Sequence, residues 1–105
     1  MSDRTVRLSG PPKLRGPEDF QTWRYVARVC IEDGDPDFVG LTPRPEEGTP
    51  AATMRKWAEA NAKERRVIVC ALGTDPLTRF GGMLADCTAK ELWDELARAY
   101  STANA

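Results

Sequence analysis

The sequence predicts an all-α protein, a small bundle of about four helices, three of them long and one short. Apolar residues recur at helical spacing in three segments. All eight prolines lie in linkers or at helix starts, and no segment shows the apolar–polar alternation with turn signals that is typical of β-hairpins. Because 105 residues suit one small domain, we expect an extended basic lead-in over residues 1–16 and a single helical domain over residues 17–105.

The lead-in contains four basic residues and one acidic residue, and its two adjacent prolines favour extended backbone. The first predicted helix begins at Pro17, because proline suits the first helical turn and the acidic Glu18 and Asp19 complement the positive end of the helix dipole. Gly34 is expected to end it. One apolar face runs along this helix and comprises Phe20, Trp23, Ala27, Cys30 and Ile31.

Residues 35–49 hold three prolines, two glycines and four acidic residues without periodicity, so they are predicted to form a long proline-rich loop. The second helix is predicted to have Thr49 as its N-cap and Pro50 at its first position, and to run to Leu72 before Gly73. Basic side chains lie mostly off its apolar face. That face comprises Met54, Trp57, Ala58, Asn61, Ile68, Ala71 and Leu72.

The third and fourth helices follow closely. The third is predicted to start at Asp75-Pro76, to carry Leu77 and Phe80, and to be interrupted within two turns by Gly81-Gly82. The fourth has the clearest start signal, since Thr88 and Glu91 match a capping box and Cys87 with Leu92 match a hydrophobic staple. Its apolar stripe comprises Leu92, Trp93, Leu96, Ala99 and Tyr100. The tryptophans, one on each long helix, are predicted to fill the core.

Composition excludes several classes of function. Histidine is absent, which removes histidine-dependent nucleophilic dyads, histidine metal ligands and a histidine pH switch. With 15 basic and 16 acidic residues, the formal net charge of −1 does not suit a general nucleic-acid binder, so any RNA contact is expected to be weak or indirect. Three cysteines without a C-x-x-C pair are interpreted as buried free thiols in a reducing compartment. The longest apolar run has six residues, and we expect a cytoplasmic, soluble protein with no membrane contact.

No arrangement of residues predicts catalysis or the binding of a cofactor or metal. Asp33, Asp35 and Asp37 alternate as in a calcium loop, but the glycine is misplaced and no glutamate stands at the twelfth position. The acidic pairs at 46–47 and 94–95 are interpreted as solvated charge. We therefore expect a protein that is not an enzyme and needs no cofactor.

Three groups of residues carry a family resemblance. Near the start, a K-L-R-G turn at residues 13–16 precedes Phe20 and Trp23; near the end, residues 88–96 read TAKELWDEL and precede Tyr100; a tryptophan-bearing helix lies between them. These features resemble the opening, the closing T-A-k-e-l-W-d-x-L-x-x-x-Y signature and the central helix of Gag capsid N-terminal domains of copia-type LTR retrotransposons. The motif and core residues are Leu14, Gly16, Phe20, Trp23, Trp57, Ile68, Leu72, Thr88, Glu91, Leu92, Trp93, Leu96 and Tyr100.

The resemblance implies a structural role. Gag capsid domains self-associate into the shell of a virus-like particle that packages the element's RNA in the cytoplasm. No C-x2-C-x4-H-x4-C zinc knuckle occurs in the sequence, so the resemblance implies only the N-terminal half of a capsid protein, from an element or as a domesticated Gag-derived protein. The expected main partner is a second copy, in a lattice of individually weak contacts.

Charge suggests how such copies would meet. Residues 17–48 have a formal charge of −5 and residues 49–73 one of +3, which favours contacts between these surfaces. Two alternatives stay open. One is a monomeric helical adaptor that binds a partner peptide in an inter-helix groove; the other is a nucleic-acid-binding module that uses the basic lead-in and the second helix.

Overall fold

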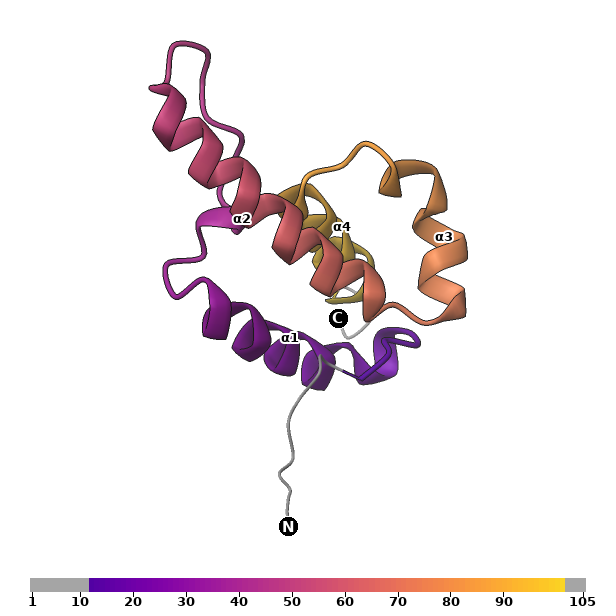
Figure 1. Ribbon diagram of the computed structural model, residues 1–105. Coiled ribbons are helices and arrows are strands. Elements are labelled where there is room, and N and C mark those ends of the chain that lie inside the picture. The colour runs from indigo at the N-terminus through magenta and orange to yellow at the C-terminus, as the bar shows by residue number, and fades with distance from the viewer. Residues whose placement is uncertain (1–11, 102–105) are drawn as a thin grey trace.

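The computed structural model describes residues 12–101, and within that range it contains four α-helices and no β-strand (Figure 1), which confirms the predicted all-α bundle. Helix α2 crosses the middle of the molecule, with α1 and α4 packed against it and α3 at one side. Two 3₁₀ turns, η1 and η2, lie before and after α1. The bounds are η1 Pro17–Asp19, α1 Phe20–Gly34, η2 Val39–Leu41, α2 Ala51–Cys70, α3 Thr74–Leu84 and α4 Ala89–Ser101.

The N-terminal end of α1 forms where the proline and the acidic residues predict it. Pro17 opens η1, which leads directly into α1. The Asp19 carboxylate accepts a hydrogen bond from the Gly16 amide at 3.1 Å and pairs with the Arg15 guanidinium at 3.2 Å. These contacts tie the chain that precedes the helix to its first turn.

The end of the predicted lead-in is part of the folded core. Leu14 is fully buried, and its backbone pairs with the chain that leaves α2: its N–H donates to the Ala71 carbonyl at 2.7 Å, and its carbonyl accepts from the Gly73 N–H at 2.7 Å. Gly73 permits this close approach, because a Cβ there would lie 2.6 Å from the Leu14 carbonyl oxygen. Residues 1–11, which contain most of the predicted lead-in, lie outside the described residues.

Helix α2 is shorter at both ends than its pattern predicts. It begins at Ala51 with Pro50 as its N-cap, and the Thr49 hydroxyl instead donates to the Glu46 carbonyl at 2.6 Å. The predicted threonine cap is therefore wrong, because that hydroxyl stabilises the preceding turn. The helix ends at Cys70, since Ala71 and Leu72 leave it to pair with the N-terminal segment.

The loop predicted over residues 35–49 contains one element that the sequence does not predict. Val39–Leu41 forms the 3₁₀ turn η2, which packs on α2. Gly40 is buried in that contact, because a Cβ there would lie 2.6 Å from the Ala60 carbonyl oxygen. Close packing on α2 therefore holds the first half of the loop in place.

Helix α3 corrects the prediction of an interrupted helix. It continues through Gly81 and Gly82 to Leu84, with Pro76 and Phe80 buried beneath it. The Arg65 guanidinium of α2 donates to the Leu84 carbonyl and holds the end of the helix. Two glycines cost about 2 kcal/mol relative to alanine, and these tertiary contacts offset that cost.

The core consists mainly of aromatic and aliphatic side chains from α1, α2 and α4. The Phe20 ring lies 5.9 Å from both the Trp23 and Tyr100 rings, and Phe80 meets Tyr100 edge-on at 6.0 Å. The cysteines do not form the buried set that the sequence predicts: Cys87 is buried, Cys30 is half-buried and Cys70 is exposed. No helix among residues 12–101 is both long and apolar enough to cross a bilayer.

Candidate functional site

The residues that carry the family resemblance lie mostly in the core, where they build the fold. Gly16 is buried at the start of η1, and Trp57 is buried apart from the main core. Thr88 is buried, Glu91 is exposed and Trp93 is half-buried. The remaining motif residues belong to one core cluster: Leu14, Phe20, Trp23, Ile68, Leu72, Leu92, Leu96 and Tyr100.

The predicted capping box is present at the start of α4. The Glu91 amide donates to the Thr88 hydroxyl at 3.1 Å, and the Thr88 amide donates to the Glu91 carboxylate at 2.9 Å. A third contact comes from α2, since the Asn61 side-chain carbonyl accepts from the Ala89 amide at 2.7 Å. The sequence periodicity predicts Asn61 on the apolar face of α2, and its side chain there joins α2 to α4 through a hydrogen bond.

The three tryptophans occupy different environments. Trp23 is 1% exposed, and its indole N–H donates to the Ala71 carbonyl at 3.1 Å. Trp93 is only half-buried, and its ring centroid lies 5.9 Å from that of Trp23. The prediction that Trp93 lies in the core is therefore wrong in part. Trp57 is buried at a second location, where its N–H donates to the Thr42 carbonyl at 3.0 Å and the Arg44 guanidinium stacks over its ring.

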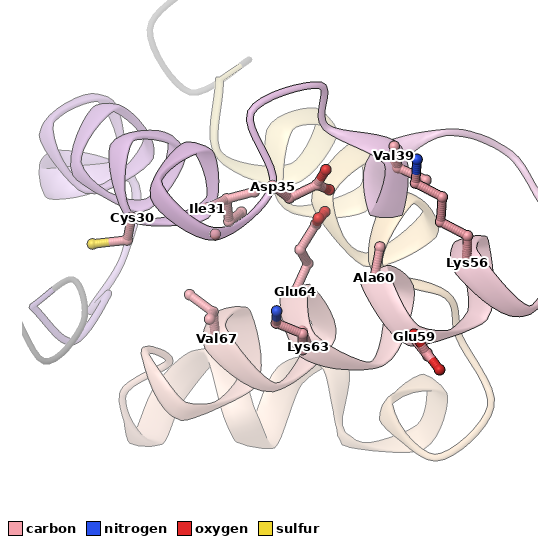
Figure 2. Close-up of a pocket in the computed structure, with 11 residues that line it drawn as sticks. Cys30, Ile31, Asp35, Val39, Lys56, Glu59, Ala60, Lys63, Glu64 and Val67 are labelled. Atoms are coloured by element: carbon pink, nitrogen blue, oxygen red, sulfur yellow. The ribbon is translucent and has the colours of Figure 1, made fainter.

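A cavity of about 250 Å³ lies between α1 and α2 and is bounded by η2 (Figure 2). Its walls combine apolar side chains, including Ile31, Val39 and Val67, with the carboxylates of Asp35 and Glu64. Lysines of α2 also line it. An apolar cavity with a few converging polar groups is the usual form of a small binding site.

Glu64 is the feature of this cavity that sequence reasoning missed. Glu64 is 3% exposed, and neither of its carboxylate oxygens has a hydrogen-bond partner among residues 12–101. Position 64 follows Trp57 by seven residues and precedes Ile68 by four, so it lies on the apolar face of α2. A carboxylate on the apolar face of a helix is the sequence pattern that could have identified Glu64.

The exposed apolar side chains form a second candidate surface. Tyr25 is 71% exposed and Val29 is 42% exposed, and they stand one helical turn apart on α1. Leu77 on α3 is 38% exposed. The Tyr25–Val29 stripe therefore presents an aromatic ring and a branched aliphatic side chain together on the outer face of α1.

Burial shifts the pKa of two side chains that lie within residues 12–101, Cys30 and Tyr100. Burial, together with Asp33, raises the pKa of the Cys30 thiol, which opposes formation of a nucleophilic thiolate. Burial also raises the pKa of Tyr100, although Arg79 opposes that shift. Asp35, considered above as part of a calcium loop, accepts the Gly40 amide at 3.0 Å, and residues 12–101 contain no group of three or more acidic, cysteine or histidine side chains placed to hold a metal ion.

Comparison with protein-family models, with curated proteins and with solved structures finds no match to this chain.

Proposed function

We propose that this chain is a structural self-association domain that contributes protein–protein contacts to a shell of the Gag capsid type. The observation that carries the proposal is the Tyr25–Val29 stripe on α1. Tyrosine is enriched at protein interfaces, because its ring buries a large area while its hydroxyl stays compatible with water. A lattice contact needs only a small patch of this kind, because symmetry repeats it many times.

The distribution of charge indicates which two surfaces meet in this contact. Residues 17–48 are strongly acidic, whereas α2 carries five basic residues and only two acidic residues. One of those two, Glu64, is buried, so the solvent-facing side of α2 is more positive than its composition indicates. We infer that the acidic segment of residues 17–48 in one copy, which includes the Tyr25–Val29 stripe, meets the basic α2 of the next copy. Such a head-to-tail contact leaves each copy able to bind another.

The resemblance to copia-type Gag capsid domains supports the same role. Its motifs account for the core and the α4 cap, and a capsid role requires no catalytic residue. As in the family, the expected site of assembly is the cytoplasm, and RNA packaging is expected to depend mainly on other parts of a capsid protein.

Sedimentation equilibrium over a range of protein and salt concentrations tests the proposal. The buffer should contain a reductant, because the exposed Cys70 thiol would otherwise permit an intermolecular disulfide. We expect association that strengthens as salt falls. Tyr25→Ser is expected to weaken it by about tenfold or more, since truncation of an aromatic contact residue commonly costs over about 1.4 kcal/mol.

The control is Leu77→Ser, which removes an exposed large apolar side chain from α3, outside the stripe. It is expected to leave association unchanged. Equal weakening by both variants would indicate general hydrophobic adhesion, and a monomer at every protein and salt concentration would refute the proposal.

A monomeric adaptor is a second candidate function, and the cavity between α1 and α2 is the observation that favours it. A partner peptide would place one side chain in this cavity, as inter-helix grooves commonly allow. A salt-insensitive monomer in the sedimentation experiment would favour this candidate over self-association.

A further inference from the structure

We propose that the cavity between α1 and α2 is a binding site for an alkylguanidinium group, the side chain of an arginine presented by a partner protein, with Glu64 as its principal ligand. This inference rests on the adaptor candidate, to which it adds the chemistry of the bound side chain. It does not depend on self-association. The decisive feature is the buried carboxylate of Glu64, both of whose oxygens lack hydrogen-bond partners within the part of the chain that the structure describes.

A buried carboxylate without a partner is unfavourable, because it gives up hydration and gains no compensating contact. Natural proteins satisfy nearly all such groups. Glu64 is also held firmly in this environment: a Cβ on Gly40 would lie 2.5 Å from its Cδ, so η2 packs directly against the carboxylate. The side chain therefore cannot move toward Gly40, and a hydrogen-bond donor that enters the cavity would satisfy it.

A second carboxylate favours a cation as that group. Asp35 lies between α1 and η2 in the chain, and one of its carboxylate oxygens accepts a hydrogen bond from the Gly40 amide at 3.0 Å. Figure 2 shows the carboxylates of Asp35 and Glu64 pointing toward one another at the edge of the cavity. Two adjacent negative groups repel each other, and a positive charge between them removes that repulsion.

The two unpartnered oxygens of Glu64 favour guanidinium over ammonium. A guanidinium presents parallel N–H donors that match both oxygens of one carboxylate, and it has further donors for a second acceptor such as Asp35. An ammonium group is a point charge without this fork. Ile31, Val39 and Val67 line the same cavity and suit the apolar stem of an arginine side chain.

Two lysines, Lys56 and Lys63, also line the cavity and oppose an incoming cation. Both are exposed, and neither forms an ion pair with Glu64 among residues 12–101. Water and salt screen exposed charges far more than buried ones. The buried carboxylate therefore dominates the interaction with a group inside the cavity.

The test is an NMR titration of the intact protein with n-butylguanidinium chloride, in parallel with n-butylurea as a neutral probe of nearly the same shape. We expect saturable shifts of the Gly40 amide and of the Ile31 and Val67 methyl groups with the cation, and much smaller shifts with the urea. Glu64→Gln is expected to weaken guanidinium binding by about 30-fold or more, as loss of one partner of a buried charge pair does. Glu59→Gln, which alters an exposed carboxylate at the rim, is the matched control and should change binding little.

Each outcome decides a separate point. Equal shifts with both probes would refute the cation site and leave an apolar cavity that still suits the adaptor candidate. No shift with either probe would overturn the inference, and so would unchanged binding by a folded Glu64→Gln protein. Should that variant not fold, the comparison of the two probes on the unaltered protein still decides between cation binding and its absence.

Discussion

Replacement of Gly73 by alanine is expected to destabilise the domain by about 1–2 kcal/mol, because it separates the N-terminal segment from the end of α2. A Cβ at this position would lie 2.6 Å from the Leu14 carbonyl oxygen, a backbone atom that cannot swing away as a side chain would. The Gly73 amide also donates to that oxygen at 2.7 Å. Relief of the clash therefore lengthens a hydrogen bond and moves Leu14 in the core.

The magnitude follows from two opposing effects. Insertion of one extra carbon into close packing costs about 1–3 kcal/mol. Alanine also restricts the unfolded chain more than glycine does, and this effect stabilises the folded protein by about 0.4–1 kcal/mol. The backbone of Gly73, at φ −77° and ψ −175°, is one that alanine adopts easily, so the packing term dominates.

Gly81→Ala is the matched control and is expected to change stability in the opposite direction. Gly81 lies inside α3, and apart from its own stretch of helix a Cβ there would meet no atom of residues 12–101 within 4 Å. Alanine favours the helix and should stabilise the protein by about 0.5–1 kcal/mol. Urea unfolding followed by tryptophan fluorescence measures both variants. A Gly73→Ala protein as stable as the unaltered chain would refute the assigned close approach.

Three further predictions concern other contacts. Trp57→Ala should cost about 3–5 kcal/mol in urea unfolding, and a folded variant with an unchanged midpoint would contradict its role in burying the loop. Thr88→Ala should cost about 1 kcal/mol by loss of the α4 cap, whereas exposed Thr78→Ala in α3 should cost far less in the same assay. Burial raises the pKa of Asp19, but hydrogen bonds from the preceding turn outweigh this and hold it below the ordinary value of 3.8. The stabilisation by ionised Asp19 is thus present above about pH 4 and lost as pH falls further. The difference in unfolding free energy between the unaltered protein and Asp19→Asn should therefore narrow in acid.

The candidate sites were less accessible to sequence reasoning than the helices. The Tyr25–Val29 stripe lies outside the predicted apolar face of α1. Because that face is buried, the helical periodicity alone predicts that the stripe is exposed to solvent. The cavity depends on how η2 packs against α2, a contact between segments that no local pattern encodes. Glu64 could be recognised as unusual by its position, but its lack of partners could not, because the partners of a side chain depend on the whole fold.

The helical class, the order of the four helices and the start of α4 follow from local patterns in the sequence. These features depend on interactions within a few residues, such as the 3.6-residue periodicity and the reciprocal bonds of Thr88 and Glu91. Long-range packing places Leu14 in the core, carries α3 through its two glycines and buries Glu64 without a hydrogen-bond partner among the described residues. Each of these depends on atoms far apart in the chain, and packing free energy between such atoms overrides local preference.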